Sequence, residues 1–137
     1  IVYDGERGLR ATRLGEGPRF VLEDVAATFP AVSPDGSVIA LMYNQHGHWE
    51  IYTVGADGGA LQRLTHSSPL EDRPPHNVAP AWSPDGQHIV FLTDRDGPWR
   101  PYIMGADGSN QRPFLPAVFD SFAFSYEFAA ERVFTWR

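Results

Sequence analysis

The sequence repeats itself at a spacing of fifty residues. The tetrapeptide Ser-Pro-Asp-Gly begins at Ser33 and again at Ser83, and the tetrapeptide Gly-Ala-Asp-Gly begins at Gly55 and again at Gly105. A repeat of this length is typical of one supersecondary unit used several times. It therefore constrains the architecture more strongly than any single residue does.

The two copies of the repeat have matching turn residues and matching apolar positions. When residues 33–64 are aligned with 83–114 without a gap, twelve of the thirty-two positions are identical. Each unit is predicted to contain four short antiparallel strands, because β-branched and aromatic runs such as 88–93 and 99–104 alternate with Pro-Asp-Gly and Gly-Ala-Asp-Gly turns. No window has a sustained period of 3.6 residues, so almost no helix is expected. Four strands in fifty residues, repeated radially, predict an all-β propeller blade.

The blades predicted from this pattern are not all complete. Residues 1–15 match the third and fourth strands of a blade, 30–65 and 80–115 are whole blades, and 122–137 match a first and second strand. Half a blade, two blades and half a blade make three, whereas a propeller closes with roughly four to eight. We expect the chain to be part of a ring of about six blades. The ring would be completed by the rest of a longer polypeptide, or by another chain.

Unpaired half blades would expose strand edges, which invite pairing with a further strand. We expect one chain end to pair with the complementary end of the next copy or segment. The interface residues predicted on this basis are Ile1, Val2 and Tyr3 at one end, and Arg132, Val133, Phe134 and Thr135 at the other.

The motifs resemble those of a known family. Residues 80–86 read Pro-Ala-Trp-Ser-Pro-Asp-Gly, and residues 102–109 read Tyr-Ile-Met-Gly-Ala-Asp-Gly-Ser. Together they are similar to the TolB-like β-propeller repeat, a WD-like repeat with a Pro-Asp-Gly turn. The resemblance implies the blade architecture. It leaves the role open, because similar propellers bind partners in the periplasm, serve as sensor domains attached to kinases, or form lids on peptidases.

Composition excludes several classes of function. The net charge is −6 and there is no basic stripe, which argues against binding to nucleic acid or to an anionic membrane. There is no cysteine, so the sequence contains no disulfide framework, thiolate metal site or thiol nucleophile. No apolar run approaches the length that spans a bilayer, so membrane insertion by this segment is not expected.

The predicted long loops at one end of the blades carry four of the five histidines. His46, His48 and His76 are candidate ligands for a Zn or Mn ion, since imidazole suits such metals. The alternative, which we prefer, is that they are solvated loop histidines and that the protein holds no cofactor. The repeated aspartates of the turns are needed for turn hydrogen bonds, so no catalytic residue is assigned.

These observations favour a non-catalytic TolB-like propeller module for protein–protein interaction or assembly, which binds a protein partner through its long-loop face. We expect it outside the cytoplasm, in the periplasm or at the cell surface. The alternatives are the propeller part of an enzyme, either a metal-dependent lyase or a peptidase lid, and the ligand-sensing domain of a membrane receptor.

Overall fold

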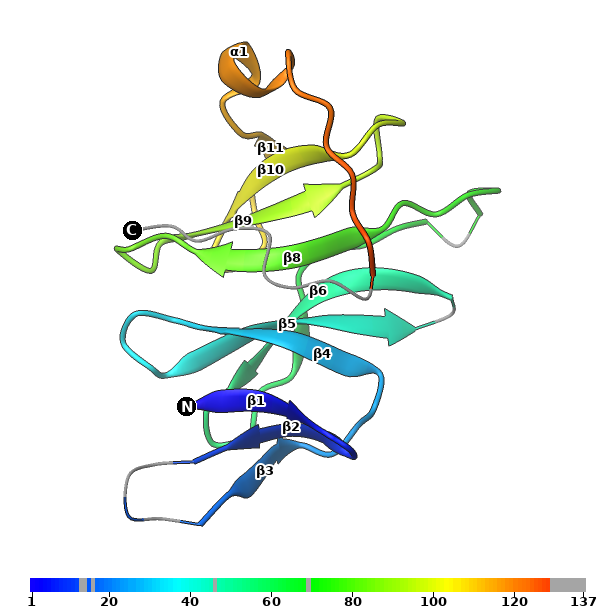
Figure 1. The fold of residues 1–137 in the computed structure, drawn as a ribbon. Coiled ribbons are helices and arrows are strands. Elements are labelled where there is room, and N and C mark those ends of the chain that lie inside the picture. The colour runs from blue at the N-terminus through cyan, green and yellow to red at the C-terminus, as the bar shows by residue number, and fades with distance from the viewer. Residues whose placement is uncertain (13–14, 16, 46, 69, 129–137) are drawn as a thin grey trace.

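The computed structural model describes residues 1–12, 15, 17–45, 47–68 and 70–128. Its strands form three antiparallel sheets that stack face to face along the chain (Figure 1). The first sheet contains β1 (Val2–Gly5), β2 (Gly8–Ala11) and β3 (Arg19–Leu22). The second contains β4 (Ala27–Val32), β5 (Val38–Gln45), β6 (His48–Gly55) and β7 (Gln62–Arg63). The third contains β8 (Asn77–Trp82), β9 (His88–Thr93), β10 (Arg100–Gly105) and β11 (Arg112–Pro113), and one helical turn follows, α1 (Pro116–Phe119).

The second and third sheets confirm the predicted all-β fold. Each is a four-stranded antiparallel meander, with the strand orders β4-β5-β6-β7 and β8-β9-β10-β11. Both first strands contain an irregularity at the same repeat position, where Phe29 and Ala79 each have φ 53°. The repeat of the sequence is therefore also a repeat of the backbone. The described residues are a fragment of a β-propeller.

The first sheet differs from its predicted strand assignment. Residues 1–15 were expected to supply a third and a fourth strand, but the sheet has three strands and its last, β3, lies beyond residue 15. A Cβ added to Gly58 would lie 2.7 Å from the carbonyl oxygen of Val21, and one added to Gly108 would lie 3.0 Å from that of Leu64. Val21 on β3 and Leu64 after β7 thus hold equivalent positions. This makes β3 the fourth strand, and β1 and β2 the second and third.

The physical reason for the wrong assignment is that two different turns use glycine. Gly5 pairs directly with Gly8 across a two-residue loop, as expected for a tight hairpin between a second and a third strand. The turn at Gly55 is wider, because the amide of Gly55 donates to the carbonyl oxygen of Gly59 at 2.7 Å. β1 also points in the same direction as β5 and β9 in Figure 1. Glycines at a fixed spacing indicate a turn, but they do not indicate which turn.

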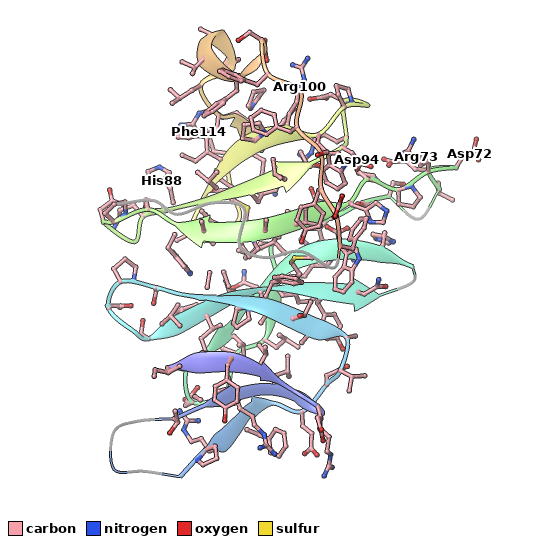
Figure 2. The ribbon with its side chains drawn as sticks, in the orientation of Figure 1. Asp72, Arg73, His88, Asp94, Arg100 and Phe114 are labelled. Atoms are coloured by element: carbon pink, nitrogen blue, oxygen red, sulfur yellow. The ribbon has the colours of Figure 1, made fainter. Side chains whose placement is uncertain are left out.

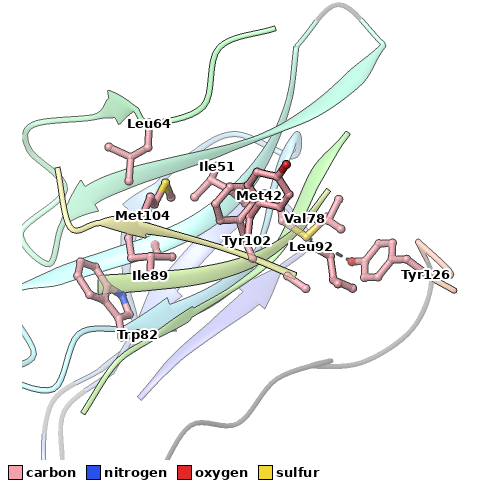
Figure 3. Packing of buried hydrophobic residues seen from close by; sticks show 13 residues of the cluster. Met42, Ile51, Leu64, Val78, Trp82, Ile89, Leu92, Tyr102, Met104 and Tyr126 are labelled. Carbon is pink, nitrogen blue, oxygen red and sulfur yellow. Dashed lines mark hydrogen bonds between the residues drawn. The ribbon is translucent and has the colours of Figure 1, made fainter. Parts of the chain in front are cut away.

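The core lies at the two seams between the sheets. Leu41 and Tyr43 of β5 belong to the buried cluster shared with the first sheet, whereas Ala40 and Met42 belong to the cluster shared with the third. Successive side chains of a strand point to opposite faces, so a strand between two blades buries both. This explains the nearly continuous apolar run of β5 and the dense packing in Figure 3.

The described part of the C-terminal segment returns to the seam between the second and third sheets. Trp99 forms an isolated antiparallel bridge with Phe124, and its ring lies 5.5 Å from that of Tyr126, which is 8% exposed. Tyr126 belongs to the buried cluster between these two sheets, and its hydroxyl donates a hydrogen bond to Sδ of Met42 on β5 at 3.4 Å. Of the strands predicted in 122–137, residues 129–137 lie outside the described residues, and with them Arg132, Val133, Phe134 and Thr135.

The other predicted interface lies at an edge of the first sheet. β1 pairs with β2 on one side and is the terminal strand of the sheet on the other. Ile1 is 88% exposed and Tyr3 is also exposed, while Val2 is half-buried. The pairing of this edge with a further strand stays a prediction. Among the described residues, no helix is long and apolar enough to cross a membrane.

Candidate functional site

The two ends of the sheets carry connections of different length. One end holds the Ser-Pro-Asp-Gly turns and the turns after β6 and β10, and we call it the short-turn face. The other holds residues 64–76, between β7 and β8, and residues 94–99, between β9 and β10, and we call it the long-loop face. Asp72, Arg73 and Asp94 gather at the long-loop face, while His88 lies toward the opposite end (Figure 2).

A buried carboxylate lies beneath the long-loop face. Glu50 on β6 is 1% exposed. Its Oε1 accepts hydrogen bonds from Nη2 of Arg63 at 2.7 Å and from the amide of Ser67 at 2.9 Å. Its Oε2 accepts from Nδ2 of Asn77 at 2.9 Å and from the hydroxyl of Thr65. One side chain therefore joins β6, the connection after β7 and the first residue of β8, and so links two blades.

The environment keeps Glu50 ionised at neutral pH. Burial raises the pKa of Glu50, but the hydrogen bonds from Thr65, Ser67 and Arg63 lower it by more, so that the pKa lies below its ordinary value. A carboxylate held in this way is a poor general acid or base at neutral pH. It fits a structural role, since a buried charge persists only where partners compensate it.

Two of the three predicted metal-ligand candidates lie near this carboxylate. Nε2 of His48 lies 3.3 Å from Oε1 of Glu50. Burial lowers the pKa of His76 by more than the nearby carboxylate of Asp94 raises it, so that the pKa lies below its ordinary value. His46 lies outside the described residues. Within the described part of the chain, no group of three or more potential ligands is arranged to hold a metal ion.

A polar pocket of about 450 Å³ opens on the long-loop face. Its lining includes Ser67, Glu71, Arg73, Asn77, Asp94 and Arg95. Oδ1 of Asp94 accepts a hydrogen bond from the amide of His76 at 2.7 Å, and its Oδ2 lies 3.4 Å from Nη2 of Arg73. Asp94 thus ties the loop after β9 to the connection before β8. The two loops that form the pocket are held together by hydrogen bonds as well as by packing.

A second pocket, of about 570 Å³, lies on the short-turn face and is lined by Asp35, Asp85 and Asp107. These carboxylates are engaged in their own turns. Asp35 accepts hydrogen bonds from the hydroxyl of Ser33 at 2.6 Å and of Ser37 at 2.7 Å, which lower the pKa of Asp35 to about 2. Asp85 and Asp107 accept equivalent hydrogen bonds from serine hydroxyls, and their pKa values are lowered as well. The carboxylates of this pocket stabilise the turns, as their repetition indicates.

The aromatic residues that recur in the second and third sheets pack between blades. Tyr52 and Tyr102 are buried within the two core clusters, and Trp49 and Trp99 pack against the cluster between the second and third sheets. The side chain of Tyr102 also donates a hydrogen bond to Oδ2 of Asp96 at 2.6 Å. These residues belong to the framework beneath the long-loop face.

Sequence reasoning missed the residues that organise this face. Glu50, Asn77 and Arg95 received no role, because none belongs to a known motif. A signal was available in the repeat: fifty residues away from Glu50 stands Arg100, and from Arg95 stands Gln45. Where two aligned repeats carry side chains of different charge, neither side chain is required for the blade fold. Such positions therefore indicate a feature that belongs to only one of the blades.

Comparisons with known proteins agree with this architecture. A family model described as the TolB beta propeller domain matches residues 21–116. The solved structure of a putative TolB from Agrobacterium tumefaciens is 26% identical, with a TM-score of 0.65 over 77% of this chain and 36% of that chain. TolB from Acinetobacter baumannii is 21% identical, with a TM-score of 0.59 over 77% of this chain and 25% of that chain.

An enzyme also shares the fold. Puromycin hydrolase is 23% identical, with a TM-score of 0.53 over 70% of this chain and 15% of that chain. The chain thus spans about a third or less of the length of each of these three proteins. The likeness to puromycin hydrolase concerns the fold alone.

Proposed function

Because the chain belongs to the TolB beta propeller domain family, we propose that it is a non-catalytic module that binds a segment of a protein partner at its long-loop face. The family is diverse in role, so the proposal rests on the site and not on the fold. Following the resemblance to periplasmic propellers, we place the module outside the cytoplasm.

The observation that carries the proposal is the polar pocket of about 450 Å³ on the long-loop face. Its walls are two connections that the chain holds in place with buried groups: Glu50 fixes Ser67 and Asn77, and Asp94 fixes the amide of His76. Loops that are ordered before binding lose little further entropy when a partner arrives. A preformed, polar and charged recess suits recognition of a protein segment.

Assembly is the second part of the proposal. The free edge of β1 would accept one further strand, supplied from outside the described residues by the rest of a longer polypeptide or by another chain. Backbone pairing at such an edge extends the sheet and would give the first blade its fourth strand. Ile1, Val2 and Tyr3 would lie at this junction, as expected from the sequence.

The test uses a phage-displayed library of random twelve-residue peptides. Peptides selected on the protein are expected to perturb amide resonances of residues 64–76 and 94–99 in a two-dimensional NMR spectrum. They should lose affinity for the variant Asp94→Asn, which weakens one wall of the pocket. The matched control is Asp57→Asn, because Asp57 lies in a turn on the short-turn face. Peptides that map to the short-turn face, or no selected peptide at all, would refute the proposal.

The enzyme alternative predicts a different result. A metal-dependent propeller enzyme requires a bound ion, which elemental analysis of the purified protein would detect as Zn or Mn in stoichiometric amount. Retention of that metal by the wild type and its loss in His48→Ala or His76→Ala would favour the enzyme. If elemental analysis detects no Zn or Mn and the selected peptides bind at the long-loop face, the results support the interaction module.

A further inference from the structure

Arg95 lines the pocket on the long-loop face, and its guanidinium is held by neutral groups. Its Nη2 donates to Oδ1 of Asn77 at 2.9 Å and to Oε1 of Gln111 at 3.0 Å, and its Nε donates to Oγ1 of Thr93 at 3.3 Å. The guanidinium carbon lies 4.7 Å from the ring centre of Tyr102, a cation–π distance. The ring and the three acceptors together fix the orientation of the cation.

The two amides that receive Arg95 are themselves oriented by other contacts. Nδ2 of Asn77 donates to the buried carboxylate of Glu50 at 2.9 Å, so Oδ1 of Asn77 must turn toward Arg95. Nε2 of Gln111 donates to the carbonyl oxygens of Leu64 at 3.0 Å and Gly108 at 3.1 Å, which fixes its Oε1 in the same way. The position of the guanidinium is therefore determined by the core beneath it, and little side-chain entropy remains to be lost on binding.

The charge of Arg95 has no carboxylate partner within the described residues, in contrast to other arginines nearby. Arg73 lies 3.4 Å from Asp94, Arg63 lies 2.7 Å from Glu50, and Arg100 lies 3.0 Å from Asp120. A cation that is rigidly placed, stacked on an aromatic ring and bound only by neutral acceptors can still accept an anion.

This arrangement is also absent from the preceding blade. Fifty residues before Asn77, Thr93, Arg95 and Gln111, the sequence has Ala27, Tyr43, Gln45 and Leu61. Blade construction does not require the four residues, because the second sheet forms without them. Their joint presence in one blade points to recognition.

We propose that Arg95 binds a single carboxylate, carried by an aspartate or glutamate side chain of the partner segment. The inference rests on the proposed binding role of the long-loop face. Nη2 and Nε of Arg95 already donate within the protein, so the two N–H groups of Nη1 are left to donate a charge-assisted hydrogen bond to a carboxylate oxygen. Glu71 and Asp94 line the same pocket, and their negative charge disfavours a doubly charged phosphate more than a singly charged carboxylate.

The test is an NMR titration with small probes, followed at the side-chain Nε resonance of Arg95 and at the amides of residues 94–97. The probes are acetyl-Gly-Glu-Gly-amide, the same peptide with Gln in place of Glu, acetyl-Gly-Gly-Gly with a free carboxyl terminus, and inorganic phosphate. We expect the Glu peptide to bind saturably in the millimolar range and the Gln peptide to bind at least roughly tenfold more weakly, as for loss of a hydrogen bond to a charged group.

Variants distinguish a specific contact of Arg95 with the carboxylate from a general effect of the protein's positive charge. Arg95→Gln should abolish binding of the Glu peptide. Arg95→Lys should weaken it, because an ammonium cannot make the three hydrogen bonds and the stacking contact that hold the guanidinium in place. Arg100→Gln, which removes the same charge outside the pocket lining, should leave the affinity within about threefold, because Arg100 is paired with Asp120 and does not line the pocket. If Arg95→Gln does not give a dispersed spectrum, Arg95→Lys alone decides.

Several results would overturn the inference. The inference would be wrong if the Glu peptide bound the wild type and Arg95→Lys with equal affinity, or if it showed no saturable binding to the wild type. It would also be wrong if phosphate bound the wild type more tightly than the Glu peptide does. If acetyl-Gly-Gly-Gly with a free carboxyl terminus bound more tightly than the Glu peptide, the carboxylate that Arg95 binds would not be that of an acidic side chain. If peptides selected from the library still bind Arg95→Gln at the long-loop face with unchanged affinity, the proposed function stands and only this inference fails.

Discussion

Replacement of Glu50 by glutamine tests the role assigned to the buried carboxylate. The amide has almost the same shape as the carboxylate, so packing is preserved and only charge and hydrogen bonding change. Its oxygen can still accept a hydrogen bond from a donor such as the amide of Ser67. Its NH2 group, however, would face donors on Asn77 and Thr65, which already point at Oε2.

The expected loss of stability follows from these contacts. Hydrogen bonds to a charged acceptor contribute about 1.5–3 kcal/mol each, and removal of one partner of a buried ion pair costs about 3–5 kcal/mol. Arg63 is partly exposed, with 29% of its side chain accessible, so water can compensate part of its loss. We therefore expect Glu50→Gln to lower the free energy of unfolding by about 2–4 kcal/mol at pH 7.

The effect must also depend on pH in a defined direction. The folded-state pKa of Glu50 lies below its ordinary value of 4.5. The stabilisation is therefore fully present above pH 4.5 and is lost as the pH falls through the lower, folded-state pKa. Glutamine does not titrate, so the stability difference between wild type and Glu50→Gln should narrow progressively in acid.

Urea unfolding followed by tryptophan fluorescence measures this difference at pH 7 and at intervals down to pH 3. Glu71→Gln is the matched control, because it makes the same chemical change at an exposed glutamate on the same face, and it should alter stability by less than about 0.5 kcal/mol. A loss below about 1 kcal/mol for Glu50→Gln at pH 7, or a difference that stays constant into acid, would refute the reasoning.

Three further predictions concern the blades. Gly58→Ala should destabilise the protein by about 1–3 kcal/mol more than Gly97→Ala, measured by urea unfolding. Both glycines have positive φ, but only at Gly58 would the new Cβ meet backbone, at 2.7 Å, while nothing lies within 4 Å at Gly97; equal losses would contradict a close contact between blades. Ser33→Ala should raise the pKa of Asp35 from about 2 toward its ordinary value, followed by carboxyl ¹³C NMR, and an unchanged pKa would disprove the assigned hydrogen bond. Phe91→Ala, at a position that is 0% exposed, should cost about 3–5 kcal/mol in a thermal or urea melt, and a loss below about 1 kcal/mol would show that the seam can collapse around the cavity.

The repeated unit of this protein and the positions of its turns can be predicted from the order of its residues. The turns that begin at Ser33 and Ser83 have the same sequence and the same backbone. Both need a positive φ at their fourth residue, Gly36 or Gly86, and glycine adopts this conformation most readily. The apolar run of β5 predicted a strand, and burial of both faces of that strand followed from stacking blade on blade. Such features are local or are repeated, so the order of residues is enough to indicate them.

The strand assignment of the first sheet and the contacts of the long-loop face became known only from the folded chain. The first sheet needed β3, which lies outside the expected range, because only contact with Gly58 identifies Val21 as part of a fourth strand. The links from Glu50 to Asn77 and from Asn77 to Arg95 join residues 27 and 18 positions apart, on different strands and loops. No periodicity or motif of the sequence predicts these contacts between side chains, because the contacts depend on how one blade packs against the next.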